Sequence, residues 1–221
     1  MCIRDSICTS DVHTVRGVIP IPAGRVLGHE SVGVVYWIGA NVARCKAGDR
    51  VAVNAVTPCG KCDYCQRGFS SQCGGMLGGY KFTAQRDGNL AEYFLVNDVD
   101  YNLVRIPASL SDEQALYTTD MMSTGFAGAE NAEIPLGGTV AIFAQGPVGL
   151  CATLGARLLG AGLVIAVESK PDRKELASQF GADVVIDPTL GDPVEQIMQI
   201  TGRVGVDSAI EAVGLPTTFE N

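Results

Sequence analysis

Histidine is scarce in this chain, and long apolar runs are missing. Among its 221 residues there are only two histidines, His13 and His29. No stretch of about 18 residues is uninterruptedly apolar, which argues against a transmembrane helix. The first residues, Met1 to Ser6, contain no apolar core of a secretory signal. We therefore expect a cytoplasmic protein.

Basic residues are also few. The chain has 16 lysines and arginines against 24 acidic residues, a net charge of −8, which argues against general binding to nucleic acid or anionic membranes. Hydrophobic residues make up 47% of the chain, as in ordinary folded proteins, so disorder is not expected. The length allows one large domain or two small ones.

The apolar pattern changes near residue 110. Before it, short apolar runs broken by Gly and Pro predict the strands of a small β-barrel or sandwich, at 32–35, 50–53, 91–96 and 102–106. After it, the pattern predicts alternating strands and helices, with strands at 139–144, 163–168, 183–187 and 206–213 and helices at 147–160, 171–180 and 193–201. This alternation predicts a parallel sheet with helices on both faces.

We therefore expect an α/β chain of two domains. Residues 1–122 carry the β-barrel pattern, and residues 123–221 carry the doubly wound parallel sheet. A complete dinucleotide-binding sheet has about six strands, whereas four are predicted before the chain stops at Asn221. We therefore expect this sheet to be truncated at its C-terminal end.

Half of the eight cysteines are clustered, at Cys59, Cys62, Cys65 and Cys73. In a reducing compartment clustered cysteines are more often metal ligands than disulfides, although disulfide pairs stay open as an alternative. An iron–sulfur cluster is disfavoured, because the bacterial ferredoxin motif has about three residues before its last cysteine, and here there are seven. Four thiolates leave no open coordination position, so the spacing predicts a structural zinc site.

A second set of metal-ligating residue types is spread along the chain, at Cys8, His29, Glu30 and Asp120. One thiolate, one imidazole and one or two carboxylates make a mixed shell, as in catalytic zinc sites with an exchangeable position. Each residue also has an ordinary interpretation: Cys8 as a small buried hydrophobe, His29 as a core histidine, and the acids as solvated side chains. Spacing alone does not decide between these interpretations.

A glycine-rich turn, Ala144-Gln-Gly146-Pro147-Val148-Gly149, lies between the first predicted strand and helix of the second half. Gly146 would let the backbone approach a pyrophosphate, and Gly149 would let the helix pack on the strand. An acid, Glu168, follows 19 residues after Gly149 and would accept hydrogen bonds from the adenosine ribose. Because that acid would repel a 2′-phosphate, NAD is favoured over NADP, although the adjacent Ser169 and Lys170 are able to bind a phosphate.

These motifs, in this order, resemble the zinc-dependent medium-chain alcohol dehydrogenases. The family landmarks are Gly28-His29-Glu30, the cysteine lobe and the glycine-rich turn. Three further stretches, 8–15, 74–79 and 120–125, look like the bacterial secondary-alcohol dehydrogenases of the isopropanol type. The resemblance runs from about Ile7 to the end of the chain. It implies a partial GroES-like catalytic domain followed by a partial Rossmann domain.

The resemblance also implies roles for the site residues. Cys8, His29 and Asp120 would hold a catalytic zinc, and Glu30 would join or leave its coordination shell. The four cysteines of the lobe would hold a second, structural zinc.

The proton relay and the cofactor contacts follow from the same resemblance. Ser10 and His13 would carry the proton of a small alcohol to solvent, and NAD would take the hydride. Thr124 joins the cofactor-binding residues. The family also implies a homodimer or homotetramer at full length.

Two departures from the family pattern keep other interpretations open. Residues 1–6 do not resemble the roughly thirty residues that precede the Cys8 motif in the family, so we expect truncation at both ends. Some secondary-alcohol relatives lack the cysteine lobe that this chain has. A polyol, threonine or formaldehyde dehydrogenase on the same scaffold, or a catalytically inactive zinc-binding fragment, therefore remain alternatives.

Overall fold

The structure, a computed structural model, describes residues 4–219 of the chain. They form two compact units that divide between Asp120 and Met121. The sequence pattern places this boundary two residues later, after residue 122.

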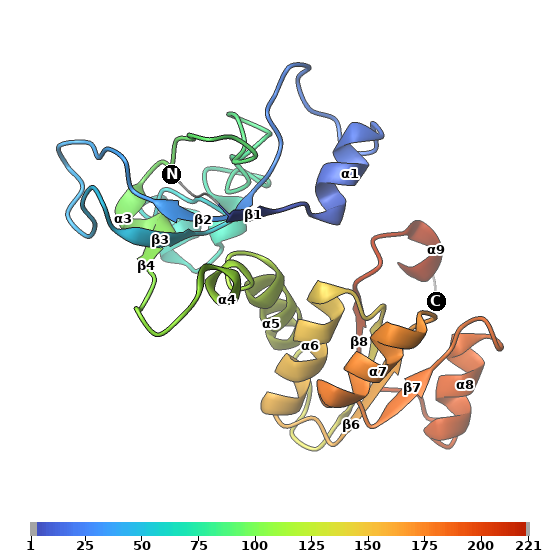
Figure 1. Cartoon of the computed structure of the whole chain (residues 1–221). Coiled ribbons are helices and arrows are strands. Elements are labelled where there is room, and N and C mark those ends of the chain that lie inside the picture. The colour runs from blue at the N-terminus through green and yellow to red at the C-terminus, as the bar shows by residue number, and fades with distance from the viewer. Residues whose placement is uncertain (1–3, 220–221) are drawn as a thin grey trace. The chain divides into compact units, whose positions relative to one another are not determined.

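The first unit is built on a four-stranded antiparallel sheet with the strand order β1-β2-β3-β4 (Figure 1). Its strands are β1 (Arg4–Ser6), β2 (Glu30–Val34), β3 (Arg50–Val53) and β4 (Leu103–Arg105). Val32 pairs with Arg4 on one side and with Ala52 on the other. The valines of the two central strands are buried, which gives this sheet its core.

Short helices connect and flank this sheet. They are α1 (Thr9–Val15), α2 (Asp63–Gln66), the 3-10 helix η1 (Ser70–Gln72), α3 (Val99–Asn102) and α4 (Asp112–Leu116). The capping box predicted for α4 is present: the Ser111 hydroxyl accepts from the Gln114 amide at 3.2 Å, and the Gln114 side chain accepts from the Ser111 amide at 3.0 Å.

One predicted strand of the first unit is wrong. Residues 91–96 form no strand, because no described segment lies beside them as a partner for a backbone hydrogen-bond ladder. Their apolar side chains instead line a groove together with residues of β2 and β3. The other three predicted strands of this half are confirmed to within two residues.

The second unit holds a parallel sheet with the order β7-β6-β5-β8. Its strands are β5 (Thr139–Phe143), β6 (Leu163–Val167), β7 (Val184–Ile186) and β8 (Ser208–Glu211). The order runs outward from β5 to β7 and then returns to the other side of β5. This reversal creates a crevice at the carboxyl ends of β5 and β8.

Helices cover both faces of this sheet, as the alternation predicts (Figure 1). They are α5 (Met121–Asn131), α6 (Pro147–Leu158), α7 (Pro171–Gln179), α8 (Pro193–Ile200) and α9 (Pro216–Phe219). Ala129, Ala152 and Ala156 from α5 and α6 pack on the face that carries Val140 and Val164. Ile197 of α8 packs on the opposite face against a second buried cluster.

None of the helices within residues 4–219 is long and apolar enough to cross a membrane.

Candidate metal centres and nucleotide-binding turn

The fold of the first unit brings the four mixed-ligand residues together. One ligand atom from each of Cys8, His29, Glu30 and Asp120 lies within 4.8 Å of the others. Cys8 is the N-cap of α1, and Glu30 is the first residue of β2 with His29 directly before it. Asp120 ends the first unit, 90 residues after Glu30 in sequence. The cluster therefore depends on tertiary structure.

A buried carboxylate that the sequence analysis did not single out ties this cluster together. Asp11 is 4% exposed, and its two oxygens accept from the backbone amides of Cys8 and Gly28, each at 3.0 Å. Its Oδ1 also lies 3.7 Å from Nδ1 of His29. A carboxylate behind a histidine ring fixes the ring's orientation and its tautomer. Its spacing of three residues from Cys8, typical of a capping box, was the available signal.

The electrostatics of this cluster favour a cation. His29 Nε2 lies 3.3 Å from Oδ2 of Asp120 and 3.4 Å from the Ser10 hydroxyl. Burial lowers the pKa of His29, but hydrogen bonds to Asp120 and Cys8 and the charge of Asp11 outweigh it and raise that pKa to about 10. Burial also raises the pKa of Glu30 above its ordinary value.

The Glu30 side chain leaves an unsatisfied oxygen at this point. It is only 2% exposed, and its Oε2 has no hydrogen-bond partner among the described residues. A buried acceptor without a donor is costly unless a proton or a metal ion satisfies it. Together with one sulfur, one nitrogen and one further carboxylate, this oxygen makes a donor set that suits zinc.

The two proposed relay residues share one helix. Ser10 and His13 lie three positions apart on α1, so their side chains are on the same face of the helix. Ser10 reaches the ligand cluster through His29. His13 is partly exposed, which suits the outer end of a path to solvent.

The four lobe cysteines also meet, with their sulfur atoms within 4.8 Å of one another. The Sγ atoms of Cys62 and Cys65 are 3.4 Å apart, far beyond the length of a disulfide bond. Backbone amides point at the sulfurs, from Cys59 to Cys73 at 3.2 Å and from Cys62 to Cys59 at 3.4 Å. Backbone donors, first that of Cys65, lower the pKa of Cys62 to about 6. Amide donors of this kind stabilise thiolates, which are the form that binds zinc.

In the second unit, the glycine-rich turn joins β5 to α6. Gly146 is the N-cap and Pro147 the first residue of this 12-residue helix. A Cβ on Gly149 would overlap the carbonyl oxygen of Ala144, so only glycine fits where the helix meets the turn. A Cβ on Gly146 would meet only a guanidinium nitrogen of Arg173, at 3.8 Å. The space before the helix N-terminus is therefore open to an anionic group.

Other predicted cofactor residues border this turn. A Cβ on Gly125 of α5 would lie 2.6 Å from the carbonyl oxygen of Val148, which puts the preceding residue, Thr124, beside the first turn of α6. Ser169 and Lys170 follow β6 directly, and their backbone amides donate to Glu168 at 2.8 and 2.9 Å.

Glu168 is more enclosed than the sequence suggests. It is 6% exposed, and its Oε2 accepts from the Gln145 amide at 2.8 Å. Burial raises its pKa, but the amides of Lys170, Gln145 and Ser169 and the nearby charge of Arg173 outweigh burial and hold that pKa below its ordinary value. Glu168 is therefore ionised at neutral pH and braces the glycine-rich turn from below.

Two more residues near these sites were missed. Arg173 is three residues after Lys170 on α7 and lies 3.8 Å from the Glu168 carboxylate, so its position in the first helical turn after β6 was the available signal. Burial and the charge of Asp120 raise the pKa of Tyr80, which puts this phenol near the mixed cluster. Nothing local in the sequence connects Tyr80 with Asp120.

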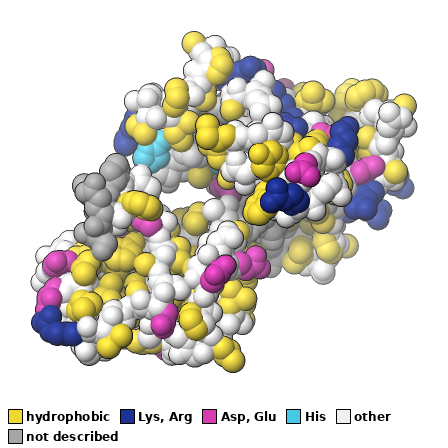
Figure 2. All heavy atoms as spheres, turned by 180° about the vertical axis from the view of Figure 1, so that it is seen from behind, with side chains coloured by type: hydrophobic (Ala, Val, Ile, Leu, Met, Phe, Trp, Pro, Cys, Tyr) yellow, Lys and Arg dark blue, Asp and Glu magenta, His cyan; other side chains and the backbone are white. Residues whose placement is uncertain are grey.

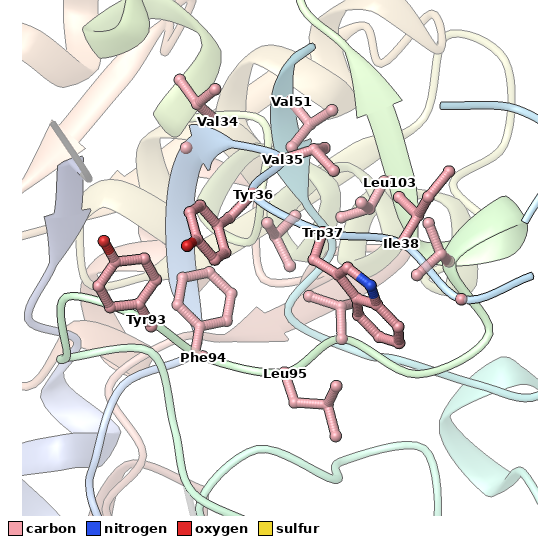
Figure 3. A pocket seen from close by; sticks show the side chains of 15 residues that line it. Val34, Val35, Tyr36, Trp37, Ile38, Val51, Tyr93, Phe94, Leu95 and Leu103 are labelled. Carbon is pink, nitrogen blue, oxygen red and sulfur yellow. The ribbon is translucent and has the colours of Figure 1, made fainter. Parts of the chain in front are cut away.

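The first unit also carries an apolar groove of about 280 Å³ (Figure 3). Tyr36, Trp37 and Leu95 are largely exposed along it, and Tyr36 and Tyr93 make an edge-to-face contact with ring centroids 5.3 Å apart. No acid, base or thiol lines this groove. It is therefore separate from the chemistry of the two metal-ligand clusters.

Surface charge does not suggest a nucleic-acid site. On the face shown in Figure 2, basic and acidic side chains lie in small groups between apolar and neutral ones. No continuous basic surface is seen on that face, in agreement with the net charge of −8.

Comparison with known proteins agrees with both halves of the fold. The family model of the alcohol dehydrogenase GroES-like domain matches residues 4–108, and that of the zinc-binding dehydrogenases matches residues 147–221. The chain belongs to the zinc-dependent medium-chain alcohol dehydrogenase family.

Relatives within this family include an alcohol dehydrogenase of Cupriavidus necator, which is 46% identical over 229 residues covering 97% of this chain and 63% of the relative. The NADP-dependent isopropanol dehydrogenase of Thermoanaerobacter brockii is 47% identical over 208 residues, covering 94% of this chain and 59% of the relative. The chain thus spans about three fifths of the length of these relatives.

Solved structures give the same result. A zinc-dependent alcohol dehydrogenase from Streptococcus pneumonia superimposes with a TM-score of 0.87 at 36% identity, over 99% of this chain and 62% of that chain. An alcohol dehydrogenase from Thermus sp. ATN1 gives 0.85 at 35% identity, over 99% and 63%.

Proposed function

We propose that this chain carries the zinc- and nicotinamide-binding sites of an oxidoreductase that interconverts small secondary alcohols and ketones. The observation that carries the proposal is the mixed cluster, in which Cys8, His29 and Asp120 surround an unsatisfied oxygen of Glu30. The second unit supports it with an open, anion-accepting turn at Gly146. The names of several relatives, isopropanol dehydrogenases of about 44 to 47% identity, support the substrate class.

In this proposal Cys8, His29 and Asp120 hold the catalytic zinc, and Glu30 is the neighbour that joins or leaves the shell. A bound zinc ion supplies a Lewis acid for the alcohol oxygen, and the nicotinamide accepts the hydride. Ser10 takes the alcohol proton and passes it outward along α1 to His13, whose imidazole exchanges it with solvent.

The cysteine lobe holds a second zinc ion in the same proposal. Its amide-to-sulfur hydrogen bonds support a closed thiolate site with no open coordination position. Its role is to stabilise the fold of the lobe rather than to take part in the reaction.

NAD is the preferred cofactor in this proposal. Thr124, Gly146, Pro147, Val148 and Gly149 surround the pyrophosphate, and the ionised Glu168 disfavours a 2′-phosphate by charge repulsion. Ser169 and Lys170 contact the adenosine ribose next to it. NADP-dependent relatives exist, so the preference is a property that the carboxylate of Glu168 would confer on this chain.

The proposal extends to assembly and location. All seven cysteines that the structure describes are free, which supports a reducing compartment such as the cytoplasm. Assembly into a homodimer or homotetramer is inferred from the family resemblance.

The deciding experiment measures zinc per chain and nucleotide reduction in parallel. We expect two zinc ions in the wild-type chain and one in His29→Ala, with the lobe retained. With 2-propanol present, NAD is expected to be reduced and NADP to be reduced at least about tenfold less efficiently. His13→Ala is the matched control, because it should keep both zinc ions and slow the reaction mainly near neutral pH. One zinc in the wild-type chain, or two in His29→Ala, would contradict the catalytic-site assignment, and bound NAD without reduction would indicate an inactive zinc-binding fragment.

A further inference from the structure

The segment that carries His29 and Glu30 is held from behind by residues 87–90. Backbone amides of Gly88, Asn89 and Leu90 donate to the carbonyls of Val26, Gly28 and Leu27 at 2.8, 3.0 and 3.0 Å. These hydrogen bonds join two stretches about 60 residues apart in sequence. The ligand-bearing turn therefore has a fixed backing rather than a free loop behind it.

The two stretches touch so closely that side chains are excluded from the contact. Gly28 has φ +96, and a Cβ there would lie 2.5 Å from Oδ1 of Asn89 and 2.8 Å from the Leu90 amide nitrogen. At this separation any movement of Asn89 is transmitted directly to the backbone next to His29.

Asn89 spans both ends of the ligand pair. Its Oδ1 abuts Gly28, and its Nδ2 donates to the Ser31 hydroxyl at 2.8 Å. Asn89 and Ser31 are both 0% exposed. One buried side chain therefore contacts the residue before His29 and the residue after Glu30.

Asn89 acts on the ligands without touching the metal side. Successive side chains of a strand point to opposite faces, so Ser31 points away from the face on which Glu30 lies. Asn89 is on the Ser31 face. Its Oδ1 has no hydrogen-bond partner among the described residues, a cost that the fold accepts at this contact.

We propose that Asn89 is a positioning residue that, through Gly28 and Ser31, sets His29 and Glu30 in the geometry that binds the metal ion. This inference rests on the proposed function, because it presupposes that the mixed cluster binds zinc. It goes further by assigning the affinity of that site to a residue that is not a ligand.

The test measures zinc affinity by competition with a graded chelator in the full chain, and the lobe zinc serves as internal reference. The mixed-site ion is identified as the one absent from Cys8→Ser. We expect Asn89→Leu to weaken this ion about 10-fold, the lower end of the effect of outer-shell changes at metal sites, and to leave the lobe zinc unchanged. Ser31→Ala should give a similar loss, and the double variant should lose little more, because both changes break the same contact.

Asn102 provides a matched control. It is 1% exposed, its Oδ1 also lacks a partner among the described residues, and its Nδ2 donates to Pro58 and Asn97 instead. Asn102→Leu is expected to lower stability as much as Asn89→Leu while leaving the mixed-site affinity unchanged. Equal losses in both variants, or wild-type affinity in folded Asn89→Leu, would overturn the proposal.

The outcomes for the two proposals are distinguishable. If the wild-type chain binds no zinc at the mixed cluster, the proposed function fails and this inference with it. If the wild-type chain binds it and the Asn89 and Ser31 variants bind it equally well, only the inference fails. Should Asn89→Leu not fold, Ser31→Ala decides alone, because it removes a single hydroxyl.

Discussion

Single atoms decide whether the glycine-rich turn of the second unit is possible. A methyl group at Gly149 would have to displace the carbonyl of Ala144, a residue that already has φ +71. We expect Gly149→Ala to destabilise the chain by about 1–3 kcal/mol, typical of overpacking, and to weaken NAD binding at least tenfold. Thermal unfolding and a fluorescence titration with NAD measure the two effects. Gly128→Ala is the control, because its Cβ would meet only Ile210 at 3.8 Å within α5 and should be neutral or stabilising.

At the residue scale, the sequence reveals ligand types but not their supports. Gly146 and Gly149 were predictable because a strand, a turn and a helix surround them in a short stretch. Asp11 and Asn89 were not, because their value comes from contacts with Gly28 and with the turn around His29, 17 to about 60 residues away. A buried asparagine has no local signature that separates it from a surface one.

At the scale of elements, the ion pair between Lys174 of α7 and Asp187 after β7 should give stability a defined pH dependence. The Lys174 ammonium lies 2.7 Å from the Asp187 carboxylate, and with Thr189 it lowers the pKa of Asp187 from 3.8 to about 2. A lowered pKa stabilises the folded state above about pH 4, and this contribution is lost as pH falls towards 2. Unfolding midpoints between pH 5 and pH 2 should therefore fall more steeply for wild type than for Asp187→Asn. Lys174→Met should behave like Asp187→Asn, and parallel curves for all three would contradict this role.

Elements with local start and stop signals were the predictable ones. Pro171 and Gly181 bound the region of α7, and Ser111 and Gln114 cap α4, so these helices begin within two residues of their predicted positions. The strand predicted at 91–96 failed for the opposite reason. Alternation shows that a segment is able to pair, whereas a strand exists only where a partner lies beside it.

At the scale of the whole molecule, the division into two units separates the metal chemistry from the nucleotide chemistry. The residues of both metal-ligand clusters lie at or before Asp120, and the glycine-rich turn lies after it. The order of motifs predicted this division. That Cys8 and Asp120 meet was not derivable from spacing, and only the family resemblance suggested it, because 112 residues separate them.

This division predicts that metal removal acts on one unit alone. Chelation should withdraw about 2.7 kcal/mol from the first unit for each site held at a free zinc concentration 100 times its Kd. Hydrogen exchange measured by mass spectrometry should then show faster exchange in β2 and β3, which follow the ligand-bearing turn, and unchanged exchange in β5 and β6. Adding NAD should do the reverse, slowing exchange around Gly146 and leaving β3 as it was. Equal acceleration in β3 and β5 on chelation would mean that the two units unfold as one, and the separation of the two chemistries would then be a feature of sequence order rather than of stability.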